Sequence, residues 1–238
     1  MLPLRPVTSP LPVLILGFVL GMRHATDADH VMAVTTMVTR QRSLRAASSI
    51  GALWGLGHTA TVLVVGGAII LFDLVVPPRL GLSLELSVSL MLVVLGGLNL
   101  LGALSRSKSP KSSSSRETHP HDEGGRSTST RVRPLMIGVV HGLAGSAAIA
   151  LLVLTTLHDA RFALFYLALF GVGTIAGMMI LTVLVALPFT LTARRFGPMH
   201  RFLTQASSAL SIGLGLFLAY RVCVVDGLFS AAPRWIPQ

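Results

Sequence analysis

The stretch LGMRHATDADHVMAV, residues 20–34, places ionisable side chains inside the first hydrophobic segment of the chain. Apolar sequence runs into this stretch from Leu11 and resumes after it. Five ionisable groups are crowded together there: Arg23, His24, Asp27, Asp29 and His30. An arginine or aspartate at the centre of a membrane helix costs about 2.5–3.5 kcal/mol. The arginine and two aspartates together therefore indicate a functional site and not an incidental cluster.

The composition predicts an integral membrane protein. Of the 238 residues, 52% are hydrophobic and 12% charged, and the mean hydropathy is +0.75. Soluble domains are about a quarter charged. The net charge of +10 would suggest nucleic acid in a soluble protein, but here the basic residues lie between the apolar runs. That placement indicates membrane topology and anionic lipid, and no nucleic-acid partner is expected.

The apolar runs predict an all-α polytopic fold with six transmembrane helices. Barrel strands would instead show about ten residues of alternating hydrophobicity. The chain starts like a signal peptide, but no cleavage site follows, so the first segment is expected to be retained. The six predicted segments are 11–38, 47–72, 86–105, 134–157, 162–187 and 203–223.

A polar, Ser-rich stretch at 106–133 separates two halves of similar size, 1–105 and 134–238. Its composition is typical of a disordered loop. Thirteen lysines and arginines fall on one side of the predicted membrane, this loop included, and five on the other. The positive-inside rule then places the loop in the cytoplasm and both termini outside a plasma (inner) membrane.

The two halves resemble each other. Gly21-x-x-His24 matches Gly138-x-x-His141, and WGLGHTATVLVVG in the second segment has a weaker counterpart in FGVGTIAGMMILT in the fifth. Because each half has three helices, the second copy would enter the membrane from the opposite side. The sequence therefore predicts two three-helix inverted repeats, a plan in which transport sites lie near the midplane.

The residues of the polar stretch allow three interpretations. Imidazole and carboxylate groups suit a divalent transition-metal ion, and the same groups could form a proton relay. The third interpretation is a buried Arg23–Asp27 ion pair with hydrogen-bonded histidines. On a regular helix His24 and Asp27 share a face while Asp29 does not, unless the helix is unwound there.

Further histidines lie in other apolar segments, and they are candidates to complete or gate the site. His58 is in WGLGHTATV and His141 in VVHGLAGSAA, where Ser146 aligns with Asp29 and offers a weak oxygen ligand. His119 and His121 in the polar loop could hold a metal ion transiently, although ordinary loop sequence is the favoured interpretation. The single cysteine, Cys223, excludes an intramolecular disulfide and a cysteine metal cluster. The chain lacks the common nucleotide-binding and hydrolase motifs, so no enzyme activity is expected.

RHATDADH resembles the H-x4-D-H signature of the nickel/cobalt transporter (NiCoT) family, here His24, Asp29 and His30, with Asp27 also matching. GLGHT around His58 is similar to the family's second motif. The acidic motifs of the family's later helices are absent, and this combination resembles the shorter, six-helix UreH-like branch. The absent acids leave the metal and the direction of transport open.

The resemblance implies a secondary transporter whose substrate is Ni²⁺ or Co²⁺, bound by His24, Asp27, Asp29 and His30 with Arg23 paired to an aspartate. No resident cofactor is expected. The alternatives are a metal-binding membrane accessory protein for urease or hydrogenase maturation, and a metal/proton exchanger for another divalent cation such as Mn²⁺ or Zn²⁺. Expected partners are the metal ion and the lipid bilayer, with a second copy of the chain or a metallochaperone as further candidates.

Overall fold

The computed structural model describes residues 11–39, 41, 43–108, 132–145, 159–195 and 197–235. Its described residues form helices and no strands, as predicted. The long elements are α3 (Leu44–Thr61), α5 (Pro78–Lys108), α7 (Ala160–Arg195) and α8 (Gly197–Tyr220). The π-helical turn η1 (Val62–Gly66) and α4 (Gly67–Phe72) continue α3, and the π-helical turn η2 (Arg221–Val225) continues α8.

Four helical stretches are long and apolar enough to cross a membrane: Leu44–Phe72, Pro78–Ser105, Ala160–Thr192 and Gly197–Val225. Two shorter apolar helices are Leu14–His24 and Val132–Gly145. The predicted fourth segment, 134–157, is described only as far as residue 145. Six spanning helices in inverted repeats therefore remain a prediction.

The predicted first segment, 11–38, is not one continuous helix. α1 (Leu11–His24) ends at the polar stretch, and α2 (Ala28–Val38) begins after three residues of turn. Asp27 precedes α2 with extended backbone, φ −61° and ψ 149°. The chain can leave the helix here because polar side chains and neighbouring helices surround the interrupted backbone, as in other broken membrane helices.

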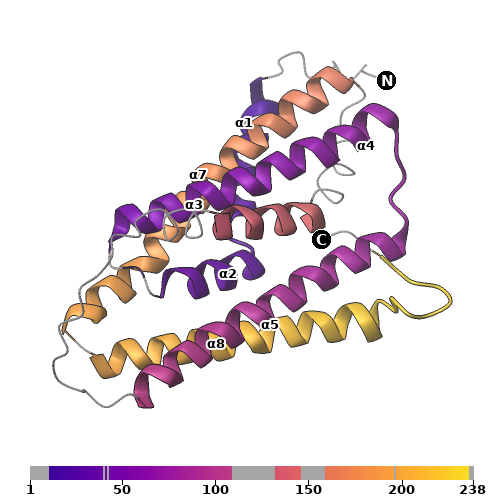
Figure 1. Cartoon of the computed structure of the whole chain (residues 1–238). Helices are drawn as coiled ribbons and strands as arrows, with labels where there is room; N and C mark the ends of the chain where they lie inside the picture. The colour runs from indigo at the N-terminus through magenta and orange to yellow at the C-terminus, as the bar shows by residue number, and fades with distance from the viewer. Residues whose placement is uncertain are drawn as a thin grey trace, which may run out of the picture.

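The helices form two groups with α2 between them (Figure 1). α7 packs along both α1 and α3, whereas α5 packs along α8. α2 contacts α7, α8 and α5 and so links the two groups. The buried core that includes Trp54, Met178 and Leu92 lies where these groups meet.

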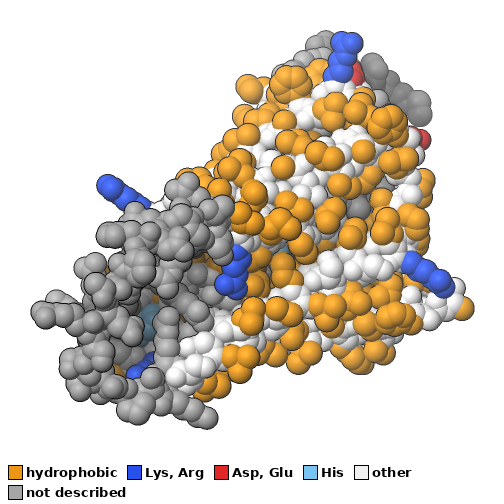
Figure 2. All heavy atoms as spheres, viewed as in Figure 1, with side chains coloured by type: hydrophobic (Ala, Val, Ile, Leu, Met, Phe, Trp, Pro, Cys, Tyr) orange, Lys and Arg blue, Asp and Glu red, His pale blue; other side chains and the backbone are white. Residues whose placement is uncertain are grey.

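Large hydrophobic side chains spread along the helices over the face seen in Figure 2. Val64 and Phe72 are each 72% exposed and Phe165 is 66% exposed. A soluble monomer rarely exposes apolar surface on this scale. These side chains are therefore suited to face lipid.

Some of the close backbone contacts at glycine correspond between the two sequence halves. A Cβ at Gly21 on α1 would meet the backbone of Phe170 on α7, and a Cβ at Gly138 would meet the carbonyl of Trp54 on α3. Likewise, Gly173 abuts Phe18 and Gly57 abuts Leu135. Because only glycine lets backbones approach this closely, the first helix of each sequence half packs on the second helix of the other half.

Candidate metal centre

The break between α1 and α2 determines which side chains can meet. The amide of Thr26 bonds the Arg23 carbonyl and the amide of Asp27 bonds the His24 carbonyl, so α1 closes in a tight turn. α2 then starts in a new direction with Asp29 in its first turn. A regular helix would turn Asp29 away from His24 and Asp27, whereas the break brings all three to one cavity.

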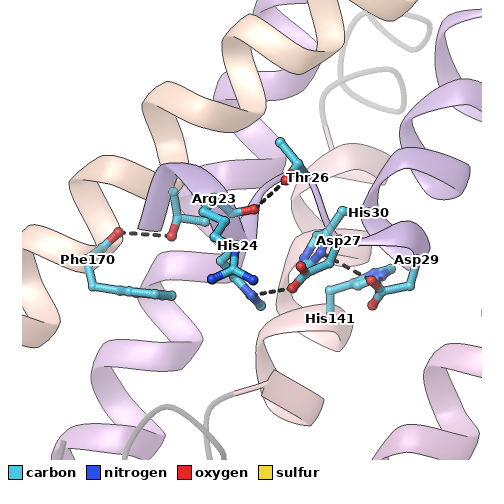
Figure 3. A network of polar contacts seen from close by, with 9 residues as sticks. Arg23, His24, Thr26, Asp27, Asp29, His30, His141 and Phe170 are labelled. Atoms are coloured by element: carbon cyan, nitrogen blue, oxygen red, sulfur yellow. Dashed lines mark hydrogen bonds and ion pairs between the residues drawn. The ribbon is translucent and has the colours of Figure 1, made fainter. Parts of the chain in front are cut away.

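His24 and Asp27 contact each other across this turn, with 2.7 Å between Nδ1 and Oδ2 (Figure 3). Asp27 occupies the position before α2 but makes no hydrogen bond to the helix amides with its side chain. Its carboxylate is 52% exposed and the imidazole of His24 is 18% exposed. The pair is therefore the more exposed part of the site.

The predicted ion pair between Arg23 and an aspartate is not present. Arg23 is exposed, and no ion pair joins it to Asp27 or Asp29, both of which the structure describes. Asp27 pairs with His24 because the turn directs its carboxylate along the inner face of the break.

His30 lies at the centre of a group of imidazole rings. Its ring centroid is 4.7 Å from that of His24, 5.3 Å from that of His58 and 4.8 Å from that of His141. His58 belongs to α3 and His141 to the Val132–Gly145 helix. Segments far apart in the sequence thus deliver four histidines to one point.

Asp29 connects this group to the second half of the chain. Its Oδ1 lies 3.3 Å from Nδ1 of His30 and its Oδ2 lies 3.4 Å from Nε2 of His141 (Figure 3). Asp29 is at the start of α2, where the helix dipole favours a carboxylate. We refer to these five residues as the histidine cluster: His24, Asp29, His30, His58 and His141.

The cluster is buried yet poor in hydrogen bonds. His30, His58 and His141 are 2%, 1% and 2% exposed. Apart from the contacts to Asp29, neither nitrogen of these three rings has a hydrogen-bond partner among the described residues. Buried polar atoms are normally paired, since leaving them unpaired costs about 1–3 kcal/mol. Unpaired imidazole nitrogens that converge are the donor set a metal ion would satisfy.

Two sets of three donors lie within coordinating reach. One is His24, His30 and His58, and the other is Asp29, His30 and His141. Within each set the donor atoms are within 4.8 Å of one another. His30 belongs to both sets. Imidazole and carboxylate donors suit Ni²⁺, Co²⁺, Zn²⁺ and Mn²⁺ and not the soft Cu⁺ ion.

A cavity of about 370 Å³ reaches the cluster. His24, Asp27, Asp29, His30 and His141 line one side of it. Side chains of α5 and α8 line the other side, and among them is the carboxyl group of Glu85. The cluster is therefore accessible through a partly polar cavity.

Glu85 is a site residue that the sequence analysis missed. The third apolar segment was predicted to begin at residue 86, whereas α5 begins at Pro78, which suits the first position of a helix. The signal was available, since Glu85 is an acidic residue flanked on both sides by apolar sequence. An intramembrane acid indicates function by default.

Three residues considered from sequence cannot be placed. Ser146, and His119 and His121 in the polar loop, lie outside the described residues. The second half contributes His141 to the described cluster. At the position corresponding to His58, it has Thr174, whose hydroxyl bonds the Phe170 carbonyl of its own helix.

Comparison with known proteins shows where the chain belongs. The urease accessory protein UreH of Bacillus sp. (strain TB-90) is 40% identical over 223 residues, which is 92% of this chain and 96% of that protein. The chloroplast proteins FOR GROWTH AND FERTILITY 1 and 2 of Arabidopsis thaliana are 28% and 26% identical. The matched regions cover 84% of this chain but only 56% and 54% of those two proteins.

No protein-family model matches the chain, and no solved structure matches it. The apolar helices and the UreH relative together make it a multi-pass membrane protein. The identity to UreH extends over nearly the full length of both proteins, so it is not confined to the motif around His24. The chain belongs to the UreH family, the UreH-like branch of the nickel/cobalt transporters that its RHATDADH motif resembles.

Proposed function

We propose that this protein is a secondary transporter that moves a divalent transition-metal ion, Ni²⁺ or Co²⁺ first among the candidates, across the cytoplasmic membrane. The observation that carries the proposal is the convergence of four histidines from α1, α2, α3 and the Val132–Gly145 helix, with His30 at their centre and Asp29 in contact with two of them. These groups are costly to bury in a membrane protein without a ligand, and most of their nitrogens have no other partner among the described residues.

The donor spacing fits an ion that draws the rings together. Ligand nitrogens about 2.0–2.1 Å from a metal ion lie roughly 3–3.5 Å apart in tetrahedral or octahedral geometry. The donors of each set lie within 4.8 Å of one another, and Asp29 already lies 3.3 Å from His30 and 3.4 Å from His141, so binding requires ring movements of at most about an ångström. Such a small movement is compatible with a site that releases its substrate as well as binding it.

The electrical potential is sufficient to drive uptake. At a membrane potential of 100 mV, inside negative, inward movement of one positive charge releases about 2.3 kcal/mol of free energy. Movement of a dication therefore releases about 4.6 kcal/mol. No ATP-binding motif is found in the sequence. Export would instead require exchange for another ion, and histidines are suited to carry protons in such an exchange.

The paired glycine contacts support an inverted-repeat architecture for the transporter. The first helix of each half packs on the second helix of the other half through corresponding residues, Gly21 on Phe170 and Gly138 on Trp54. The broken helix α1–α2 and the Val132–Gly145 helix then bring the rings of His24 and His141 to 4.7 and 4.8 Å from the ring of His30. A site between repeats is the usual location in such transporters.

A second candidate function is a metal-binding accessory protein. It is favoured by the name of the Bacillus relative, urease accessory protein UreH. In that function the histidine cluster would hold the ion for a partner protein without releasing it across the membrane. Both functions would use the same binding site, and they differ in whether the ion crosses the membrane.

The decisive experiment is ion flux into proteoliposomes, tested with Mn²⁺, Co²⁺, Ni²⁺ and Zn²⁺. His24→Ala and Asp29→Ala are expected to abolish flux of the transported ion. His200→Ala is the matched control because His200 packs on Phe189, outside the cluster. Retained flux in both cluster variants would overturn the site assignment.

The same samples distinguish the alternatives. Stoichiometric metal binding without flux, together with recovery of urease or hydrogenase assembly proteins in pull-downs, would support the accessory function. Flux that requires an opposing proton gradient would support exchange. Flux driven by an inside-negative potential alone would support uptake.

A further inference from the structure

Glu85 shares a cavity with the histidine cluster but lies on a different helix. It projects from the first part of α5, and the same cavity is lined by Asp29, His30 and His141. Ser89, one turn further along α5, lies on the cavity wall between apolar side chains. Glu85 thus provides a carboxylate on the wall of this cavity without belonging to either set of three donors.

The C-terminal segment holds this carboxylate in position. The indole N–H of Trp235 donates a hydrogen bond of 2.8 Å to Oε1 of Glu85. The Trp235 ring rests on Gly81, where a Cβ would collide with it, and it packs against Ile69 and Leu82. This contact engages one carboxylate oxygen and fixes the other relative to the cavity.

Charged residues of both signs lie near Glu85 at this end of the cavity. Asp226 and Arg221 are both near enough to Glu85 to interact with it electrostatically. The backbone N–H of Arg234 donates a hydrogen bond to the backbone carbonyl of Asp226. This bond folds the C-terminal segment back toward α5. The count of lysines and arginines predicts that this end of the bundle faces outward.

We propose that Glu85 is the first binding position of the divalent cation on its way to the histidine cluster, and that Trp235 orients its carboxylate. This rests on the proposed transport of a divalent metal. The ion would pass from an oxygen donor in the cavity wall to nitrogen donors at the cluster, which bind transition metals more strongly. The hard carboxylate would bind the ion weakly, and the imidazoles would then bind it more strongly and favour transition metals over Mg²⁺ and Ca²⁺.

The test measures Ni²⁺ binding kinetics with the whole purified chain. Free Ni²⁺ is followed with a metal-sensitive dye, because Trp54 lies beside the cluster and Trp235 beside Glu85, so tryptophan fluorescence would mix the two positions. Glu85→Gln is expected to slow Ni²⁺ association about 10-fold, the equivalent of about 1.4 kcal/mol. Because Glu85 acts on the route and not at the final site, dissociation should slow equally and the equilibrium Kd should stay unchanged.

Three further variants separate this role from a structural one. Glu85→Asp should restore most of the association rate, and Trp235→Phe, which keeps the ring but loses the N–H, should slow association less than Glu85→Gln does. Asp73→Asn is the matched control, since it removes an exposed acid at the same end of the bundle and asparagine tolerates its left-handed backbone, φ 49°.

The outcomes distinguish this proposal from the proposed function. An unchanged association rate in Glu85→Gln, or a raised Kd with unchanged association, would overturn the role of Glu85. These measurements need no flux, so they remain decisive if proteoliposomes move no Ni²⁺. Where flux is observed, Glu85→Gln should raise the Ni²⁺ concentration for half-maximal rate and leave the maximal rate near that of the wild type.

Discussion

Asp29 on α2 and His141 on the Val132–Gly145 helix lie opposite each other, with 3.4 Å between Oδ2 and Nε2. The other oxygen of Asp29 contacts His30 at 3.3 Å. The Asp29 carboxylate thus connects His30, in the first half of the chain, to His141, in the second half. The first half contributes the acid and three of the imidazoles, so the site is asymmetric even though the helix contacts around it occur in pairs.

The first prediction concerns the charge of Asp29. Asp29→Asn keeps the shape of the side chain but removes the negative charge that offsets the charge of the ion. We expect the affinity for Ni²⁺ to fall at least about 10–100-fold, the range seen when groups that support metal ligands are removed. Equilibrium dialysis measures it, with His200→Asn as the control. Wild-type affinity in Asp29→Asn would exclude Asp29 from the site.

His30 is expected to be the most sensitive of the histidines. It belongs to both sets of three donors, whereas His24 belongs to one and His141 to the other. His30→Gln should therefore reduce Ni²⁺ binding more than His24→Gln or His141→Gln does. Titration calorimetry on the three variants ranks them. A larger loss in either single-set variant would contradict a central role for His30.

Gly138→Ala tests the close packing of the helices. The new methyl group would collide with the Trp54 carbonyl, which belongs to the backbone and cannot move away cheaply. Overpacking of this kind costs about 1–3 kcal/mol, so the temperature of unfolding in detergent should fall. Gly97→Ala is the control because nothing lies within 4 Å of its Cβ position. Equal unfolding temperatures for the two variants would contradict the packing.

Asn99→Ala tests how α2 is held in place. The amide of Asn99 accepts a bond from Thr39 at the end of α2 and donates one to Ser208 on α8. Hydrogen bonds between membrane helices contribute on average about 0.6 kcal/mol and at most about 1.7 kcal/mol each. Thermal unfolding should show a loss of this size. Ser105→Ala, which removes an exposed hydroxyl on the same helix, should leave the stability unchanged.

The predicted orientation can be tested with single cysteines. In a Cys223→Ser chain, Ser113→Cys in the polar loop should react with an impermeant thiol reagent only after the cells are opened. Ala231→Cys, near the C-terminus and exposed, should react in intact cells. The reverse pattern would invert the topology that the lysine and arginine counts predict.

The sequence was sufficient to predict the helical class and to single out the residues that the structure brings together in the histidine cluster. Long apolar runs leave few alternatives to helices in a bilayer, because every backbone polar group must be paired there. The cost of burying Asp29 and the neighbouring histidines also marked these residues as site candidates. The start of α5 was missed because Arg79 and Glu85 lower the local hydropathy, and so the carboxylate of Glu85 in the cavity wall was missed too.

By itself, the sequence determined which residues are too costly to bury without a purpose, since that cost depends on residue type and on the surrounding hydropathy. The tertiary structure decided which of them meet. The break after His24 turned Asp29 toward His30 and His141 and left Arg23 outside. Residue spacing could not reveal this, because the direction of a chain after a helix break is set by the helices it packs against, here α5, α7 and α8.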